Sequence, residues 1–310
     1  MLKNEKITLD ILIVNWNSGL LLLESINSIN CARSDSFKLN RVIVVDNDSN
    51  DSSLSGIEDL ELPIIIISNK ENLGFAKACN QGAKNSKADY LLLLNPDTKL
   101  FSDSLSDPIS FLEKMENDSV GIVGVQLRDE NNLISRNCSR FPTPFSLIYT
   151  SIGLDKLFPN IFPPHFMIEW DHLNSRYVDQ VMGSFFLVRR SLFEKLNGYD
   201  ERFFVYYEDL DFSYRAKKLG YSTFYLASTQ IYHKGGGTSE KAKADRLAYV
   251  LHSKLQYSKK HFNIILYLII LFITILIEPL LRSISLLFKC QLSSISETFL
   301  GYKKLIGKLF

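Results

Sequence analysis

The sequence predicts an α/β fold in which helices flank a mostly parallel sheet, followed by an apolar helical segment near the C-terminus. Runs of Ile, Leu and Val alternate with helical patterns through the first half of the chain. Apolar strands separated by helices are typical of a parallel sheet covered on both faces. Residues 264–277 contain a single weakly polar side chain, Thr274. A segment without a polar face is either fully buried or in a membrane.

The predicted elements follow in order along the chain. Strands are expected at residues 9–16, 42–46, 64–68, 90–95 and 120–127, with helices at 20–29, 52–60 and 75–85. Further on, strands at 182–188 and 221–226 alternate with helices at 192–196, 208–219 and 240–261. Residues 128–178 are rich in proline and aromatic residues, so we expect a long irregular loop there.

Composition excludes several classes of protein. The net charge of +1 gives no field that would attract nucleic acid. The four cysteines are scattered without C-x-x-C spacing, which argues against a zinc site or a disulfide framework and fits a reducing compartment. No signal peptide is visible, so we expect the chain to start in the cytoplasm. A length of 310 residues allows one large domain or two.

Polar residues cluster where three of the predicted strands end. Asn15 ends the first strand, Asp46 ends the second, and the fourth runs into Asn95-Pro96-Asp97. Each cluster alone could be turn chemistry, because Asn, Asp and Ser are common turn formers. Ligands of parallel sheets bind outside the carboxyl ends of the strands, so three clusters on that edge predict a shared site.

Residues 203–215 hold the most informative pattern of the chain. Aromatic residues lead into the carboxylates Glu208, Asp209 and Asp211, and Arg215 follows. A carboxylate beside an apolar wall is the environment of a general base. The alternative is an ordinary helix start, where acidic residues favour the N-terminus and Asp211 pairs with Arg215 at i,i+4 spacing.

Several motifs occur in an order that resembles one enzyme family. They are residues 13–17, 44–49, 72–82, 94–97, 183–184, 198–201, 208–211 and His233. Together they resemble family 2 glycosyltransferases, most of all the bacterial rhamnosyltransferase-like branch, over about residues 8–240. The resemblance implies a GT-A fold with a Rossmann-like sheet, a nucleotide-diphosphate sugar donor (dTDP-rhamnose or a UDP-hexose), a divalent metal and inversion at the anomeric carbon.

The resemblance also implies a metal site. Asp97 stands at the last carboxylate of the family's Asp-x-Asp motif and is expected to be the direct ligand. Asn95 replaces the first carboxylate, and is expected to hydrogen-bond the nucleotide sugar or a metal-bound water. His233 can complete the site. Mg²⁺ and Mn²⁺ prefer oxygen ligands, and Mn²⁺ also accepts imidazole.

The remaining nucleotide contacts are expected from the strand ends and one helix. Asn15 and Asp46 should meet the base or ribose. Asn72 and Gly74 open the helix at 75–85, whose N-terminus favours anions. Lys77 could reach phosphate, or could be a solvated lysine.

Inverting transfer needs a base on the face opposite the leaving diphosphate. Asp209 matches the family's Asp in its Glu-Asp motif and is assigned as that base. Glu208 would orient Asp209 or bind the acceptor. Asp211 and Arg215 would hold the helix in place.

The predicted domains are a glycosyltransferase domain at residues 1–240, with 128–178 as an acceptor-side loop or lid, and a membrane-associating region at 241–310. The expected acceptor is a lipid-linked glycan of cell-surface polysaccharide synthesis, at the cytoplasmic face of the cell membrane, and association into homo-oligomers stays open. A sugar nucleotidyltransferase or a dehydrogenase would need a Gly-rich loop after the first strand, which residues 15–19 lack. A catalytically silent sugar-binding or scaffold protein is a further alternative, against which Asp97 and Asp209 argue.

The mode of membrane association depends on residues 262–281, which take in Asn263, Glu278 and Pro279. Both flanks of this segment are basic, so a single span would place one of them on the unfavourable side of the membrane. Pro279 could break the helix and turn the chain back. We therefore expect a re-entrant or in-plane anchor on the cytoplasmic leaflet, with a single span or a buried helix as alternatives.

Overall fold

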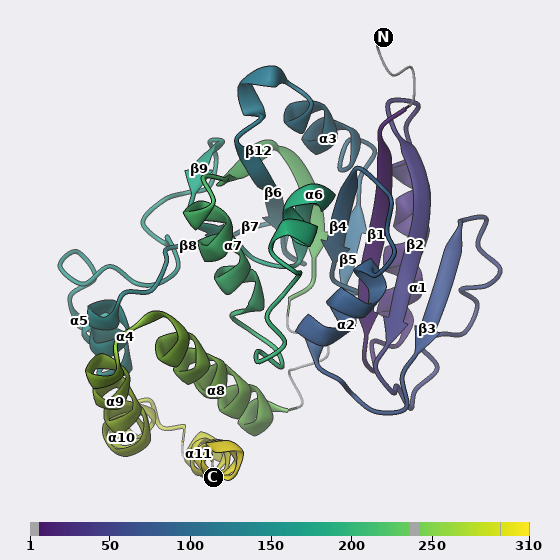
Figure 1. The fold of residues 1–310 in the computed structure, drawn as a ribbon. Helices are drawn as coiled ribbons and strands as arrows, with labels where there is room; N and C mark the ends of the chain where they lie inside the picture. Colours follow the sequence, from purple (N-terminus) through teal and green to yellow (C-terminus); the bar gives the residue numbers. More distant parts are fainter. Residues whose placement is uncertain (1–5, 236–241, 292, 310) are drawn as a thin grey trace.

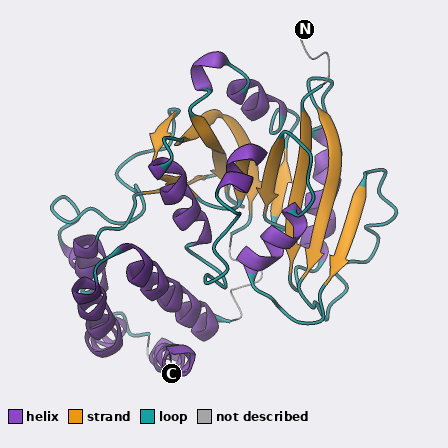
Figure 2. Ribbon diagram, viewed as in Figure 1, coloured by secondary structure: helices purple, strands orange, loops and turns teal. Residues whose placement is uncertain are grey.

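A mixed sheet forms the centre of the protein, and helices cover both of its sides (Figure 2). The structure, a computed structural model, describes residues 6–235, 242–291 and 293–309. The strand order is β3-β2-β1-β4-β11-β6-β12-β5. Strands β1 (Thr8–Asn15), β2 (Lys38–Asp46), β3 (Ile64–Ser68) and β4 (Tyr90–Leu94) are parallel, so their carboxyl ends share one edge.

The second half of the sheet mixes strand directions. Strand β11 (Phe185–Arg189) runs antiparallel to β4 and to β6 (Val120–Arg128). Strand β12 (Ser222–His233) is parallel to β6, and its end pairs antiparallel with β5 (Thr98–Leu100). This pairing carries the end of β12 to the edge where β4 ends.

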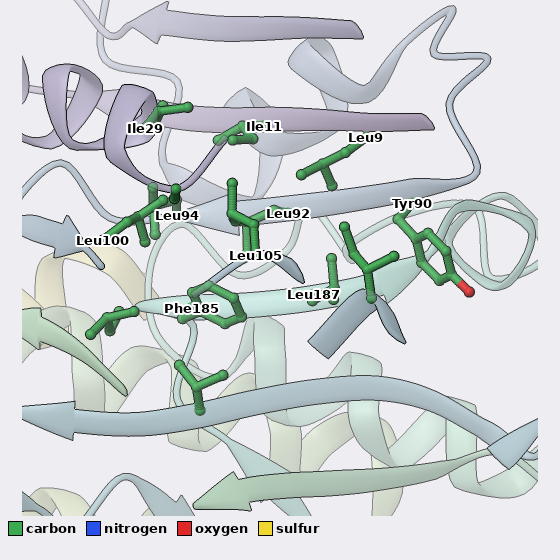
Figure 3. Packing of buried hydrophobic residues seen from close by; sticks show 14 of the residues in the cluster. Leu9, Ile11, Ile29, Tyr90, Leu92, Leu94, Leu100, Leu105, Phe185 and Leu187 are labelled. Carbon is green, nitrogen blue, oxygen red and sulfur yellow. The ribbon is translucent and has the colours of Figure 1, made fainter. Parts of the chain in front are cut away.

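Apolar strands supply the core on both faces of the sheet. On one face, side chains from β1, β4 and β11 pack with α1 (Leu20–Cys31) and α3 (Ser106–Leu112). Figure 3 shows this layer, with Ile11, Leu92 and Phe185 in its middle and Ile29 of α1 against it. The other face packs against α2 (Phe75–Ala83), α6 (Arg190–Lys195) and α7 (Glu208–Lys218).

Two local predictions are wrong. Residues 52–60 form turns instead of a helix, because Asp51 accepts a hydrogen bond from the Ser53 N–H and Gly56 has a φ of +76°. Residues 128–178 are not one irregular loop. They contain the helices α4 (Pro144–Ser151) and α5 (Leu154–Leu157), and the short strands β7 (Ile134–Ser135), β8 (Cys138–Ser139) and β9 (Arg176–Val178).

Proline misled the prediction for residues 128–178. Pro144 lies in the first turn of α4, where a missing N–H costs nothing, and Thr143 caps the helix by accepting a hydrogen bond from the Ser146 N–H. Strand β10 (Gln180–Val181) pairs with β8 and closes this region against α7.

Between residues 242 and 309, the described part of the C-terminal region forms helices and no strands (Figure 1). They are α8 (Lys243–His261), α9 (Ile264–Phe272), the π-helical η2 (Ile273–Ile277), α10 (Glu278–Phe288) and α11 (Ser293–Leu309). The expected break at Pro279 is wrong, because α9, η2 and α10 form one continuous helix. A π turn directly before Pro279 accommodates its missing N–H, and Pro279 lies in the first turn of α10.

Candidate active site

Asn15 and Asp46 meet at the carboxyl edge of the sheet. They are register partners of β1 and β2, and Asn15 Nδ2 donates to Asp46 Oδ1 at 2.6 Å and to Ser53 Oγ at 2.7 Å. The Ser49 N–H donates to Asp46 Oδ2 at 3.1 Å. Asn15 is fully buried, so it fixes the Asp46 carboxylate from behind. Contact of either residue with a nucleotide stays a prediction.

Gly74 joins the donor edge to the segment before α7. Asn72 Oδ1 accepts from the Gly74 N–H at 2.9 Å, and Asn47 Nδ2 donates to the Gly74 carbonyl at 3.1 Å. A Cβ on Gly74 would lie 2.5 Å from the Phe204 carbonyl oxygen, which also accepts from the Phe75 N–H at 2.6 Å. The absence of a side chain at Gly74 therefore allows the Phe204 backbone to approach closely. Lys77, also on α2, is exposed.

The structure brings Asp97 and His233 together although they are far apart in sequence. His233 is the register partner of Thr98, and its Nε2 lies 3.3 Å from Asp97 Oδ1. The Lys234 N–H donates to the Asp97 carbonyl at 3.0 Å. Two neighbouring ligands of an octahedral ion, each at about 2.1 Å, are separated by about 3 Å. The pair therefore fits one Mg²⁺ or Mn²⁺, although no group of three such side chains gathers within the described ranges.

Gly183 and Ser184 connect the metal motif of Asn95 and Asp97 to the predicted base, Asp209. The Asn95 N–H donates to the Ser184 carbonyl at 3.1 Å, and the Gly183 N–H donates to Asp209 Oδ2 at 2.8 Å. A Cβ on Gly183 would lie 3.3 Å from that same carboxylate oxygen. The two residues directly before β11 thus hold the metal motif on one side and Asp209 on the other.

Neutral donors orient the carboxylate of Asp209. Gln180 Nε2 donates to Oδ2 at 2.9 Å and the Leu210 N–H donates to Oδ1 at 2.7 Å. Burial raises the pKa of Asp209 to about 6, and these hydrogen bonds only partly oppose that rise. A carboxylate with this pKa is ionised near neutral pH and still basic enough to take a proton.

Glu208 does not hydrogen-bond Asp209. Its side chain is buried, and its Oε2 has no hydrogen-bond partner among the described residues. Burial, followed by the charge of Asp209, raises the pKa of Glu208 well above its ordinary value. Gln180 performs the orienting role that was one of two expected for Glu208, and nothing in the sequence around Gln180 indicates this role. Acceptor binding by Glu208 stays a prediction.

The chain enters α7 through an uncommon backbone. Tyr206 and Tyr207 have φ angles of +69° and +70°. Left-handed non-glycine residues cost conformational energy and cluster at functional sites. The Tyr207 ring lies 5.7 Å from that of Tyr257 on α8, and this packing holds the turn that begins the helix.

Asp211 holds α7 in place, as predicted, and has more partners than the sequence indicated. Arg215 Nε donates to it at 2.7 Å, Lys260 Nζ lies at 2.6 Å and His261 Nε2 at 2.7 Å. Lys260 also contacts Asp200 at 2.6 Å. Burial alone would raise the pKa of Asp211, but the His261 hydrogen bond and the charges of Arg215 and Lys260 lower it. Helix α8 is thereby tied to the helix that carries Asp209.

Family models match most of this chain. "Glycosyl transferase family 2" matches residues 10–196, and "Glycosyl transferase family group 2" matches residues 164–303. The chain belongs to glycosyltransferase family 2. It is therefore a glycosyltransferase of glycan synthesis, and the rhamnosyltransferases among its relatives support the predicted branch.

Two relatives illustrate that branch. The N-acetylglucosaminyl-diphospho-decaprenol L-rhamnosyltransferase of Mycobacterium tuberculosis is 26% identical over 230 residues, which are 70% of this chain and 73% of the relative. Rhamnosyltransferase WbbL of Escherichia coli is 30% identical over 149 residues, which are 47% of this chain and 52% of the relative.

Solved structures share the fold. A mannosyltransferase from Pyrobaculum calidifontis, in complex with GDP-Man and Mn²⁺, has a TM-score of 0.58 and 14% identity, covering 98% of this chain and 88% of its own. GalNAc-T7 with UDP, GalNAc and Mn²⁺ has a TM-score of 0.53 and 16% identity, covering 74% of this chain and 43% of its own. The predicted GT-A fold is confirmed.

Proposed function

We propose that this glycosyltransferase is inverting and metal-dependent, and moves a sugar from a nucleotide diphosphate to a hydroxyl of a lipid-linked glycan. The observation that carries the proposal is the backbone bridge of Gly183 and Ser184, which holds Asp209 beside the motif of Asn95 and Asp97. A base and a site for the leaving diphosphate must lie on opposite sides of one sugar, and this bridge fixes their separation.

The residues divide the chemistry between them. Asp97 and His233 would hold a divalent ion, which stabilises the charge that develops on the leaving phosphate. Asp209 would take the proton of the acceptor hydroxyl, and Gln180 keeps its carboxylate oriented. The solved structures that contain Mn²⁺ with a nucleotide or nucleotide sugar support the choice of cofactor.

The donor and acceptor follow from the branch. The rhamnosyltransferase relatives favour dTDP-rhamnose, with UDP-hexoses as the second candidate. The M. tuberculosis relative is named for a diphospho-decaprenol acceptor, which supports a lipid-linked acceptor in cell-surface polysaccharide synthesis. The apolar 25-residue helix Ile264–Phe288 is long enough to cross a membrane and supports work at a membrane, where such acceptors lie. We assign that work to the cytoplasmic face.

Nucleotide binding tests this proposal. A thermal-shift panel of dTDP-rhamnose and UDP-hexoses, each with and without Mn²⁺, should give a metal-dependent rise in Tm for one donor, because ligand binding stabilises the folded state. Asp97→Ala should abolish the metal-dependent part of that rise. Asp118→Ala, at an exposed position just before the start of β6, is the matched control and should behave like wild type. Equal affinity with and without Mn²⁺ in the wild type would overturn the metal site.

A further inference from the structure

One face of the long apolar helix is bound to the rest of the protein. Ile270 and Ile273 are buried, and Ile270 packs in a cluster with Leu251 of α8, Leu147 of α4 and Leu305 of α11. The segment Ile264–Phe288 is therefore surrounded by protein on this side, whereas a lone membrane span would be surrounded by lipid.

The same face carries a buried charge. Glu278 is 2% exposed, and its Oε2 lies 2.6 Å from Nζ of Lys254 on α8, which also donates to Ser151 of α4 at 3.1 Å. Arg282 donates to the second Glu278 oxygen at 2.7 Å. Moving this helix into the bilayer core would expose these groups to lipid, which is costly for unpaired charges. The ion pair therefore favours a helix that stays against α8.

The opposite face is apolar along its whole length. Every fourth residue is a large apolar side chain with at least 47% of its surface exposed, and these are Ile264, Leu268, Phe272, Leu276, Leu280, Ile284 and Phe288. Because an α-helix has 3.6 residues per turn, side chains spaced four residues apart shift gradually around the helix axis. The π-helical segment η2 has more residues per turn and offsets part of this shift. An exposed patch of this size marks an interaction surface.

A second element extends the apolar surface. Phe145 of α4, Leu157 of α5, and Phe158 and Ile161 after it are between 53% and 70% exposed. Helix α4 contacts both α9 and η2, and Figure 1 shows α4 and α5 beside α9 and α10. The two apolar stretches thus belong to one side of the molecule.

We propose that the stripe on α9–α10 and the exposed apolar residues of α4–α5 form one docking surface, which lies in the plane of an anionic membrane. It deepens the proposed function by naming how the enzyme meets the membrane of its acceptor. The segment predicted as an acceptor-side lid is, in this inference, the second membrane contact. The active site stays outside the bilayer, tied to this surface through α8.

The charges around this docking surface indicate which partner it binds. Arg282 on α10, Lys289 directly after it and Lys303 on α11 are exposed, and Glu297 is the single exposed acid among the described residues after Glu278. Basic residues bordering an apolar face attract anionic lipid headgroups. A two-fold dimer through the same face would bring equal basic borders together, which is unfavourable. A bilayer is therefore the better partner.

Vesicle flotation tests the surface with the full-length protein and no sugar donor. Wild type should float with phosphatidylglycerol-containing vesicles, and bind phosphatidylcholine vesicles more weakly. Leu268→Glu with Leu276→Glu should reduce binding at least ~10-fold, and Phe158→Glu should reduce it several-fold, because each places charge in the apolar layer. Met115→Glu is the matched control, since Met115 is 89% exposed outside this surface, and it should bind like wild type.

The controls separate the outcomes. Circular dichroism and Tm should show that all variants fold. Unchanged vesicle binding in the Leu268 and Leu276 variant overturns the inference, as does a soluble dimer that this variant dissociates without any vesicle binding. A protein that transfers sugar but ignores vesicles refutes the docking surface alone, whereas vesicle binding without nucleotide binding refutes the proposed function alone.

Thiol accessibility distinguishes an in-plane helix from a span. Helix α11 follows the apolar helix and contacts α8 through Lys304 and Asp245 at 2.6 Å. A thiol at Lys303→Cys, in a Cys290→Ser background, should therefore react with a membrane-impermeant maleimide on intact vesicles to which protein was added from outside. The exposed native Cys31 is the internal reference. Protection of the new thiol until detergent is added, while Cys31 reacts, would establish a span and overturn the inference.

Discussion

Asp209 and Asp211 both lie in the first turn of α7, but their surroundings shift their pKa values in opposite directions. Asp211 is surrounded by Arg215, Lys260 and His261, and its pKa is lowered. Among the described residues, Asp209 accepts hydrogen bonds from neutral donors alone, and its pKa is raised to about 6. Only Leu210 stands between them in the sequence. Cationic partners keep a carboxylate permanently ionised and structural, whereas neutral partners in a buried site leave it able to accept a proton.

Of the substitutions that test this comparison, replacement of Asp209 should have the largest effect. Asp209→Asn should lower kcat by about 10²-fold or more with donor affinity unchanged, because general base catalysis is lost while the donor edge is intact. Steady-state kinetics and calorimetric donor binding measure the two quantities. Asp118→Asn serves as the surface control. Near-wild-type turnover in Asp209→Asn would move the base role to another group.

Removing a cation from the structural carboxylate should affect stability instead. Lys260→Met leaves Asp211 with two partners, and should lower the free energy of unfolding by about 1–3 kcal/mol, while turnover per folded molecule is retained. The pKa of Asp211 is lowered in the fold, so its contribution is present above its ordinary value of 3.8 and is lost as pH falls through the folded pKa.

Urea unfolding of wild type and Lys260→Met at neutral and acidic pH measures this effect. The difference between the two proteins should shrink on acidification, since the depressed pKa is partly relieved in the variant. Lys259→Met, its exposed neighbour, is the control. A turnover loss as large as that of Asp209→Asn would mean that the two sides of α7 are not separate.

Neutralising Glu208 should have the smallest effect and the opposite sign. The pKa of Glu208 is raised, so the folded state keeps a proton that the unfolded state releases above its ordinary value of 4.5, and stability falls as pH rises above that value. Glu208→Gln removes this loss. Its Tm relative to wild type should therefore increase from acidic to alkaline pH. A constant Tm difference across pH would show that Glu208 is ionised in the fold.

Local patterns in the sequence predicted the parts of the fold that local chemistry decides. Apolar runs located the strands, and polar residues at their ends located Asn15, Asp46 and Asp97 at one edge. Packing between distant segments decided the rest. Gln180 reaches Asp209, and Lys260 reaches Asp211, only because the sheet and α8 bring separate segments together. Neither contact could be predicted, because no periodicity or motif in the sequence indicates it.

Two of the three errors have the same origin, because proline was interpreted as a breaker. Pro144 lies in the first turn of α4, where proline is tolerated, and the π turn of η2 accommodates Pro279 inside a continuous helix. The convergence of Asp97 and His233 was predicted through the family resemblance, and the pairing of β12 with β5 provides its physical basis.

The pH dependence of turnover tests the central claim, that neutral surroundings make Asp209 the base. Its pKa is raised to about 6, and a base works when deprotonated. Between about pH 5 and about pH 8, kcat/KM of the wild type, which reports groups of the free enzyme, should rise through an apparent pKa of about 6 and then level off. The residual activity of Asp209→Asn should lack that rise. A wild-type profile that is flat across this range, or a rise near pH 6 that persists in Asp209→Asn, would contradict the assignment.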